Sequence, residues 1–205
     1  INMLALLGWN PGTEQEIFDL QGLVDAFDLS KVSKSGAKFD FEKGKWFNQL
    51  YLRDLSEAEL AHELKNVLDN EGLSYNEAHL GTIATMMSER ATFPQDLLEE
   101  GRFLFETPTE YDEKTRAKKW NEESAPMMKD LAARFNALPD FTSEAIEACF
   151  KGYLAEKELG FGKVGPSFRL AVTGKGMGPS MFTICAVLGK DEVLARISKA
   201  IEVLG

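Results

Sequence analysis

The chain has 205 residues, 44% of them hydrophobic and 27% charged, which is the composition of an ordinary globular protein long enough to build a hydrophobic core. Two cysteines and two histidines are too few for a disulfide framework or a four-ligand zinc site, so we predict no metal centre. The formal net charge of −10, taken as an average, argues against a nucleic-acid binder, because such proteins usually carry a basic surface.

The start of the chain shows no targeting signal. The first ten residues, INMLALLGWN, lack the basic region and the cleavage site of a signal peptide, and no run reaches the 18 apolar residues of a membrane-spanning helix. Since the chain opens on Ile1 inside an apolar helical run, we expect a piece cut from a longer protein.

Charge is unevenly distributed along the chain. Residues 28–53 hold six basic and three acidic side chains, residues 54–115 hold four basic and fifteen acidic, and residues 160–190 hold four basic and no acidic ones. Two positive segments that flank a negative one can focus a polyanion onto part of a surface. The alternative is that the uneven charge arises by chance on solvent-exposed faces. Considered without other evidence, the charge distribution favours this alternative.

Apolar spacing predicts helices along almost the whole chain. Leu20, Leu23, Val24 and Phe27, for example, follow the i, i+3, i+4, i+7 spacing of a helix face. Residues 33–40 and the Asn10-Pro11-Gly12 turn are predicted to be irregular, and Ser74 or Asn76 is predicted to cap the helix that contains 80–87. The predicted helices cover 2–7, 20–27, 41–52, 56–70, 80–87, 94–105, 109–121, a segment around 131–135, 142–153, 181–188 and 191–204.

Capping residues mark where several of these helices begin. Ser56 and Glu59 have the spacing of a capping box, Pro94 suits the first position of a helix, and Thr142 starts another. No alternating strands, internal repeat or coiled-coil heptads are present. We therefore predict a mainly α fold, a multi-helical bundle with no Rossmann domain. Trp9, Trp46 and the Cys149 thiol are expected in the core.

Two segments partly resemble nucleotide-binding motifs of enzymes, but the surrounding sequence does not support a catalytic role. Residues 31–35, KVSKS, are similar to the KMSKS loop of class I aminoacyl-tRNA synthetases, but that loop works beside a Rossmann nucleotide site, which the sequence lacks. Residues 173–180, TGKGMGPS, do not match a P-loop. We interpret the second segment either as a flexible loop or as a loop whose bare backbone approaches RNA. No catalytic residues are predicted.

Several longer blocks carry a family resemblance. In the right order, and over essentially the whole chain, the sequence resembles the part of bacterial glutamyl-tRNA synthetases that follows the KMSKS loop. The blocks are NMLALLGWNPG at 2–12, KVSKSGAKFD at 31–40, KGKWFN at 43–48, SERATF at 88–93, RLAVTG at 169–174, GPSMF at 178–182 and LGK at 188–190. Gly44 departs from the family, which usually has leucine there, and costs roughly 1 kcal/mol against alanine in a helix interior.

The resemblance implies a recognition role without catalysis. The HIGH-type motif and the true KMSKS loop of the family precede the equivalent of Ile1. The parent enzyme, glutamate–tRNA ligase, uses ATP and Mg²⁺ to charge tRNA with glutamate, whereas this chain is expected to need no cofactor and to be inactive alone. The expected units are the end of the stem-contact domain, 1–54, and two helical anticodon-binding subdomains, 55–138 and 139–205. The expected partner is tRNA(Glu), and neither a membrane nor DNA is expected as a partner. The protein is expected to be cytoplasmic and monomeric.

The resemblance also implies site residues. It places Arg90 and Arg169 at anticodon-facing positions, with Gly178 and Met181 beside the bases. Guanidinium planes and apolar contacts suit unstacked RNA bases. We expect both arginines to be exposed on one face without a bidentate carboxylate. For Arg90 the alternative is a helix-surface ion pair with a neighbouring acid.

Basic residues in or near the loops 33–40 and 173–180 are candidates for contact with the RNA backbone. These are Lys34, Lys43, Lys45 and Lys175. Their alternative role is simple solvation. The competing interpretation of the whole chain is a helical protein–protein interaction module that does not bind RNA, which its acidic middle and amphipathic helices would also suit.

Overall fold

The computed structural model describes residues 1–205 and consists of helices joined by loops, with one isolated β-bridge between Trp9 and Val32 and no sheet. The mainly α prediction is confirmed, and no Rossmann fold is present. The α-helices are α1 (Asn2–Gly8), α2 (Leu20–Ala26), α3 (Phe41–Asp54), α4 (Glu57–Glu71), α5 (Leu80–Ser88), α6 (Pro94–Gly101), α7 (Glu113–Lys119), α8 (Ser124–Asn136), α9 (Ser143–Glu156), α10 (Phe161–Thr173), α11 (Met181–Leu188) and α12 (Lys190–Leu204).

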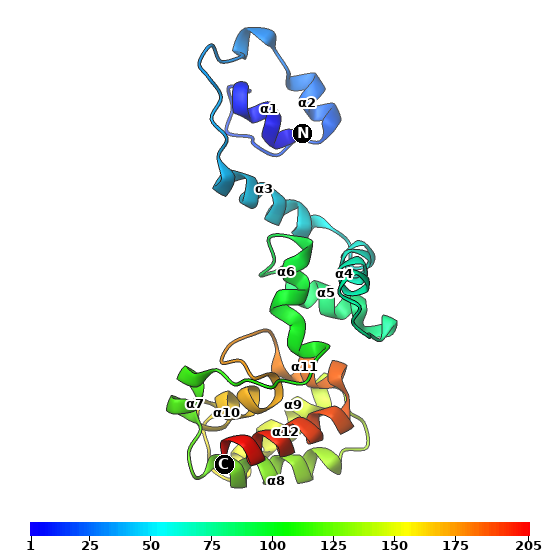
Figure 1. Ribbon diagram of the computed structural model, residues 1–205, viewed down its shortest axis with the longest axis vertical. Coiled ribbons are helices and arrows are strands. Elements are labelled where there is room, and N and C mark those ends of the chain that lie inside the picture. The colour runs from blue at the N-terminus through cyan, green and yellow to red at the C-terminus, as the bar shows by residue number, and fades with distance from the viewer.

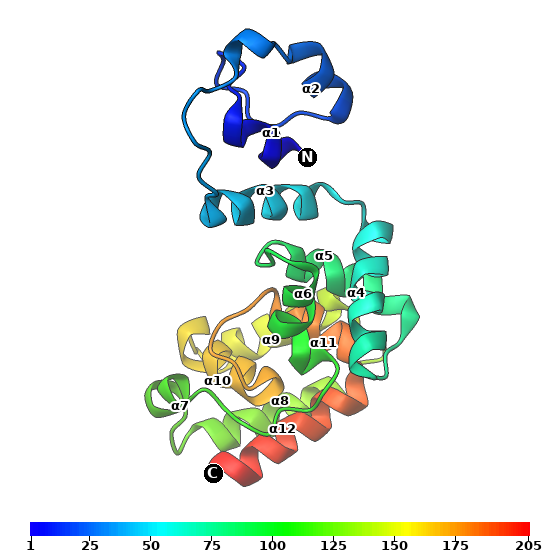
Figure 2. The ribbon, with the colours of Figure 1, turned by 45° about the horizontal axis from the view of Figure 1, so that its top comes forward.

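The molecule is elongated, and its parts follow the chain from one end to the other. Figure 1 shows α1 and α2 at the top, α3 as a single helix below them, then α4 to α6, and α7 to α12 packed together at the opposite end. Figure 2 shows the same order from a second direction. None of these helices is both long and apolar enough to cross a lipid bilayer.

Local signals set many helix ends as predicted. Ser56 and Glu59 form the capping box of α4, in which the Ser56 amide donates to the Glu59 carboxylate at 2.8 Å. Gly72 ends α4 with a φ of +68°, in the left-handed region that glycine adopts without strain. Pro94 is the first residue of α6, and Thr142 caps α9.

Two separate hydrophobic clusters hold the chain together. The main cluster contains 33 buried residues between Leu52 and Leu204, whereas the small cluster contains only Trp9, Phe18 and Leu23. The predicted apolar face of α2 is therefore only partly buried. Leu20, Val24 and Phe27 on that helix and its end are exposed by 64%, 62% and 55%.

Helix α3 connects the two clusters. Phe47 and Leu52 on this helix are buried, but Trp46 is 40% exposed, so the prediction that Trp46 belongs to the core is wrong. The reason is that α3 is packed by other helices on only part of its surface. Gly44 faces α1, where a Cβ would lie 3.2 Å from the Met3 side chain. The glycine thus permits close contact between α1 and α3.

Helix α10 has no counterpart among the predicted helices, because Gly160, Gly162, Gly165 and Pro166 all fall at or near its first two turns. Burial overrides these weak helix formers. Most of the following residues are buried, and Phe168 packs 5.4 Å from Phe135 and 5.5 Å from Phe150 between ring centroids. Tertiary packing of an apolar helix outweighs its intrinsic propensity.

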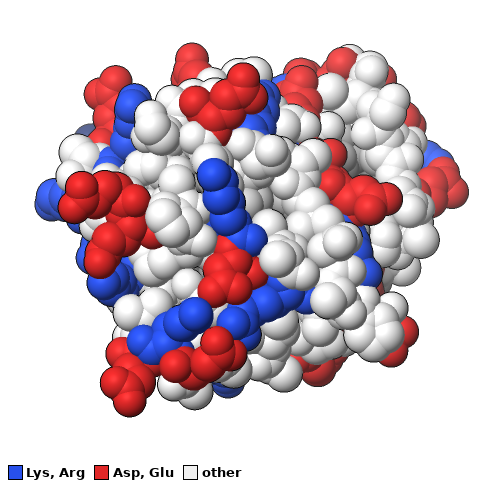
Figure 3. Space-filling view, turned by 90° about the horizontal axis from the view of Figure 1, so that it is seen from below, with Lys and Arg blue, Asp and Glu red and all other residues white.

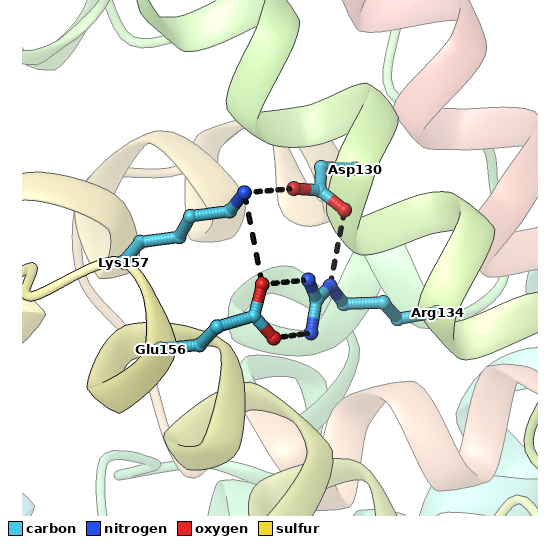
Figure 4. Close-up of polar contacts among 4 residues, drawn as sticks. All are labelled: Asp130, Arg134, Glu156 and Lys157. Atoms are coloured by element: carbon cyan, nitrogen blue, oxygen red, sulfur yellow. Dashed lines mark hydrogen bonds and ion pairs between the residues drawn. The ribbon is translucent and has the colours of Figure 1, made fainter.

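Helices α8 and α9 are joined at the surface by four charged side chains (Figure 4). The Arg134 guanidinium donates two hydrogen bonds to Glu156, at 2.8 and 2.9 Å, and a third to Asp130 at 3.0 Å. These hydrogen bonds lower the pKa of both carboxyl groups below their ordinary values. Lys157 completes the ring at 3.5 Å from Asp130 and 3.7 Å from Glu156.

A second arginine, Arg196 on α12, is buried and joins three segments. Its guanidinium donates to the carbonyl oxygens of Phe103 at 2.6 Å and Val172 at 3.0 Å. A longer bond of 3.4 Å reaches the Glu106 carbonyl, and Nε donates to the Glu192 carboxylate at 2.7 Å. Because buried carbonyls need donors, this one side chain fixes the segment after α6 and the end of α10 against α12.

We predict that Arg196→Met lowers the free energy of unfolding by about 3 kcal/mol or more, since each buried carbonyl left without a donor costs roughly 1–3 kcal/mol. Urea denaturation measures the change. Lys151→Met is the matched control, because it removes an exposed ion pair with Glu147 worth roughly 0–1 kcal/mol. Equal losses for the two variants would show that Arg196 does not have the role described.

Candidate nucleic-acid interface

Arg169 supports the glycine-rich loop formed by residues 174–180. It lies on α10, and its half-buried guanidinium donates from Nη2 to the Pro179 carbonyl oxygen at 2.7 Å. The other terminal nitrogen, Nη1, is buried and has no hydrogen-bond partner. A Cβ on Gly178 would lie 2.9 Å from this nitrogen, so only glycine lets the loop pass so close to the guanidinium.

Two further glycines fix the same loop against the segment that leads into α7. Gly174 has a φ of +71°, and its carbonyl oxygen accepts from the Asp112 amide at 2.8 Å. A Cβ on Gly176 would collide with the Thr115 hydroxyl. The glycines therefore allow close approach to the protein itself. This packing does not fit the interpretation of 174–180 as merely a flexible loop.

Arg90 meets this loop from another helical unit. It is exposed, follows α5 and shares a cavity of about 140 Å³ with Lys175 and Gly178. Glu99 and Glu100 of α6 also line this cavity. Arg90 and Arg169 are 79 positions apart in the sequence, and the fold brings their guanidinium groups near each other.

The two arginines lack a direct carboxylate partner, although Glu99 and Glu100 line the cavity at Arg90. Neither forms an ion pair with a carboxylate, although the chain has 33 acidic residues. Burial, and then the nearby Arg90 charge, lower the pKa of Arg169 from its ordinary value. A guanidinium stays protonated at neutral pH even so. The unpartnered Nη1 and the exposed Arg90 are donors that a ligand rich in acceptors would satisfy.

The environments of the predicted anticodon residues differ from expectation in two places. Arg169 is half-buried rather than exposed, because its guanidinium is also used to hold the loop. Met181 begins α11, and its side chain is only 4% exposed because it packs into the main cluster. Met177 is the apolar side chain that the loop presents, at 82% exposure. Met177 lies between Gly176 and Gly178, and this position in a glycine-rich loop is the sequence signal that could have indicated an exposed side chain.

The predicted backbone-contacting lysines fall into two groups. Lys34 is exposed in the 33–40 loop, whereas Lys43 and Lys45 on α3 form ion pairs with Glu16 at 2.5 Å and Glu42 at 3.0 Å. Lys175 is exposed beside Arg90 and forms no ion pair. Figure 1 and Figure 2 place the start of α3 well away from α10 and α11, which flank the glycine loop.

The side chains that could ligate a metal or act as a nucleophile are few and dispersed. No three His, Cys, Asp or Glu side chains come together in a way that would hold a metal ion. Cys185 is fully buried, which raises the pKa of its thiol to about 12, and Cys149 is half-buried. Such thiols are packing residues rather than reactive groups.

The chain is thus an all-helical protein in which two neighbouring guanidinium groups lie beside a closely packed glycine loop. The sequence model of a family described as an anticodon binding domain matches residues 52–201. The chain therefore belongs to the anticodon binding domain family.

Relatives and solved structures agree with this assignment. The chain is 48% identical to a glutamate–tRNA ligase of Phocaeicola vulgatus and 45% identical to one of Bacteroides fragilis; each match covers the whole chain and 40% of the relative. The crystal structure of a glutamate tRNA ligase from Elizabethkingia meningosepticum matches with a TM-score of 0.93 and 38% identity, over 100% of this chain and 40% of that one. The chain thus spans about two fifths of the length of these relatives.

The contact between Gly176 and Thr115 gives a stability prediction. Gly176→Ala places a methyl group on the Thr115 hydroxyl, and overpacking of this kind costs roughly 1–3 kcal/mol. Gly162→Ala, with nothing within 4 Å of its added methyl group in α10, should instead stabilise by up to about 1 kcal/mol. Thermal unfolding reports both signs. Thr115→Ala should restore stability to the Gly176→Ala variant; a failure to do so would locate the strain elsewhere.

Proposed function

We propose that this chain recognises the anticodon and inner stem of tRNA(Glu) as part of a glutamate–tRNA ligase. The observation that supports it best is the pair Arg90 and Arg169, which come from separate helical units, lie close enough for the Arg90 charge to act on Arg169, and have no ion-pair partner. The names of the relatives supply the amino acid and the tRNA. The whole enzyme would use ATP and Mg²⁺ to charge the tRNA, in a part of the protein that carries a nucleotide-binding domain.

The residues around the cavity offer hydrogen-bond donors, hydrogen-bond acceptors and an apolar surface to a base. Arg90 would donate to base oxygens and ring nitrogens, while the Glu99 and Glu100 carboxylates would accept from exocyclic amino groups. Arg169 lies behind the glycine loop, where its buried Nη1 has no acceptor. Met177 would supply an apolar surface for stacking. Gly178 belongs to the lining of the cavity, and the backbone at Met181, the first residue after the loop, is proposed to lie beside the bases.

Four lysine side chains, one of them in the lining of the cavity, would position the RNA without reading it. Lys34, Lys43 and Lys45 are candidates for the inner stem, and Lys175 for the backbone near the anticodon. We propose the same division as the sequence predicts: 1–54 as the end of the stem-contact domain, with 55–138 and 139–205 as two anticodon-binding subdomains. The parent is proposed to be a cytoplasmic monomer.

A test of the central proposal is Arg90→Gln and Arg169→Gln. Each should lower affinity for the cognate tRNA by roughly 5- to 150-fold, because a guanidinium that reads a base edge contributes roughly 1–3 kcal/mol of discrimination. Affinity for a tRNA with a substituted anticodon should barely change. Filter binding or fluorescence anisotropy measures both.

Arg134→Gln is the matched control, because its guanidinium is committed to Glu156 and Asp130. It should leave both tRNAs bound as before. If cognate and substituted tRNAs lose affinity equally in the Arg90 variant, Arg90 does not read the anticodon. Absence of any tRNA binding by the unmodified chain at low salt would favour the protein–protein interaction module instead.

A second prediction concerns Lys34 and Lys45. Changing both to alanine should weaken cognate and non-cognate tRNA alike, because interactions with phosphate carry no sequence information. The slope of log affinity against log salt should fall by about 0.7 to 0.9 for each phosphate that is no longer neutralised. Lys151→Ala, which removes an ion pair with Glu147 on α9, should leave the slope unchanged. Weakening confined to the cognate tRNA would contradict a backbone role.

A further inference from the structure

The short helix α7 carries basic side chains that the fold leaves unused. Lys114, Arg116, Lys118 and Lys119 are all exposed, and none takes part in an ion pair. Elsewhere most basic residues are paired with a carboxylate or donate to a backbone carbonyl, as Arg134, Lys190 and Lys199 do. In a chain of net charge −10, four neighbouring cations without acidic partners are an exception that needs a cause.

None of the acidic residues around α7 forms an ion pair with these four side chains; these residues are Glu110, Asp112, Glu113, Glu122 and Glu123. The Asp112 carboxylate caps the helix by accepting from the Thr115 amide at 2.7 Å. Glu113 lies in the first turn, at the other end from Lys118 and Lys119. Beyond the helix, Glu123 is paired with Lys163 at 2.7 Å. Figure 3 shows basic and acidic side chains intermingled over the end face seen from below.

The position of α7 is tied to the glycine-rich loop of the candidate interface. The Asp112 amide donates to Gly174, and Thr115 packs against Gly176. At the other end of the helix, the Ser167 hydroxyl of α10 donates to the Lys119 carbonyl oxygen at 2.6 Å. The helix and the loop therefore form one unit, and Lys175 on the loop adds a further unpaired cation next to them.

We propose that α7 binds the ribose–phosphate backbone of the same RNA strand whose bases meet Arg90 and Arg169, a role that rests on the function proposed above. The chemistry favours phosphate over bases. Three of the four side chains are lysines, which act as flexible point charges, and α7 itself carries no aromatic residue for stacking. Phosphate contacts of this kind fix the register of a nucleic acid and leave the reading of sequence to other groups.

The test uses a triple variant, Lys114→Gln with Lys118→Gln and Lys119→Gln, in the otherwise unchanged chain. The matched control is Lys65→Gln with Lys129→Gln and Lys151→Gln, which removes the same charge from α4, α8 and α9. Binding of cognate tRNA and of a tRNA with a substituted anticodon is measured by anisotropy over a range of salt concentrations, and thermal unfolding verifies that both variants are folded.

We expect the α7 variant to reduce the salt slope by about 2, since each single-strand phosphate contact contributes about 0.7. At 0.1 M salt the same relation gives roughly fivefold weaker binding for each phosphate, or about 100-fold in total. The ratio between the two tRNAs should be unchanged, and the control variant should bind as the unmodified chain does.

Three results would overturn the proposal. A salt slope equal to that of the control variant would show that α7 does not contact RNA. A changed ratio between the two tRNAs would show that α7 acts by shaping the glycine loop. Unchanged tRNA binding combined with the disappearance of binding to an acidic protein would make the basic face a protein-docking surface. Failure of the unmodified chain to bind tRNA would instead defeat the proposed function, before any variant is compared.

Discussion

The arrangement of the candidate interface depends on one buried cation. The Arg196 guanidinium holds the carbonyl oxygens of Val172, in the last turn of α10, and of Phe103, just after α6. The first of these segments continues into the glycine loop, and the second continues through Glu106 towards α7. Because both are attached to the same rigid side chain, the loop and α7 keep a constant relation to each other. A binding surface assembled from loops gains its definition from buried contacts of this type.

The same surface contains polar groups that the fold leaves without partners. Arg169 keeps a buried nitrogen without an acceptor, and Arg90 adds a like charge beside it. A structure selected only for stability would place a carboxylate between them, and Glu99 and Glu100 line the same cavity without doing so. Violations of local satisfaction are typical of functional sites, where the missing partner is supplied by a ligand. The unpaired lysines of α7 extend this pattern along the surface.

The local signals in the sequence are sufficient to predict most helices, because caps and prolines act over a few residues. Ser56, Pro94 and Thr142 each begin a helix where expected. Tertiary effects account for the differences. Helix α10 forms in spite of its glycines because its apolar residues are enclosed, whereas Trp46 is exposed because α3 is covered on only part of its surface.

The candidate site is predictable only in part. The resemblance names Arg90 and Arg169, and the fold brings them together, but the half-burial of Arg169 follows from a bond to Pro179 that no sequence pattern encodes. Periodicity cannot show that Met181 turns inward while Met177 points outward, since both lie within or beside a loop of irregular backbone. The role of Gly176 is equally hidden, because it depends on Thr115, sixty-one positions earlier in the chain.

The division of the chain into two hydrophobic clusters has an optical consequence, because its three tryptophans occupy three different settings. Trp9 is 5% exposed in the small cluster, Trp46 is 40% exposed on α3, and Trp120 packs against the main cluster after α7. Opening of the small cluster would shift the emission of Trp9 to longer wavelength, while Trp46, already partly exposed to water, would change less. Trp120 would respond only when the large helical unit loosens. Single-tryptophan versions of this chain would therefore report separately on the loss of order at each end of the molecule.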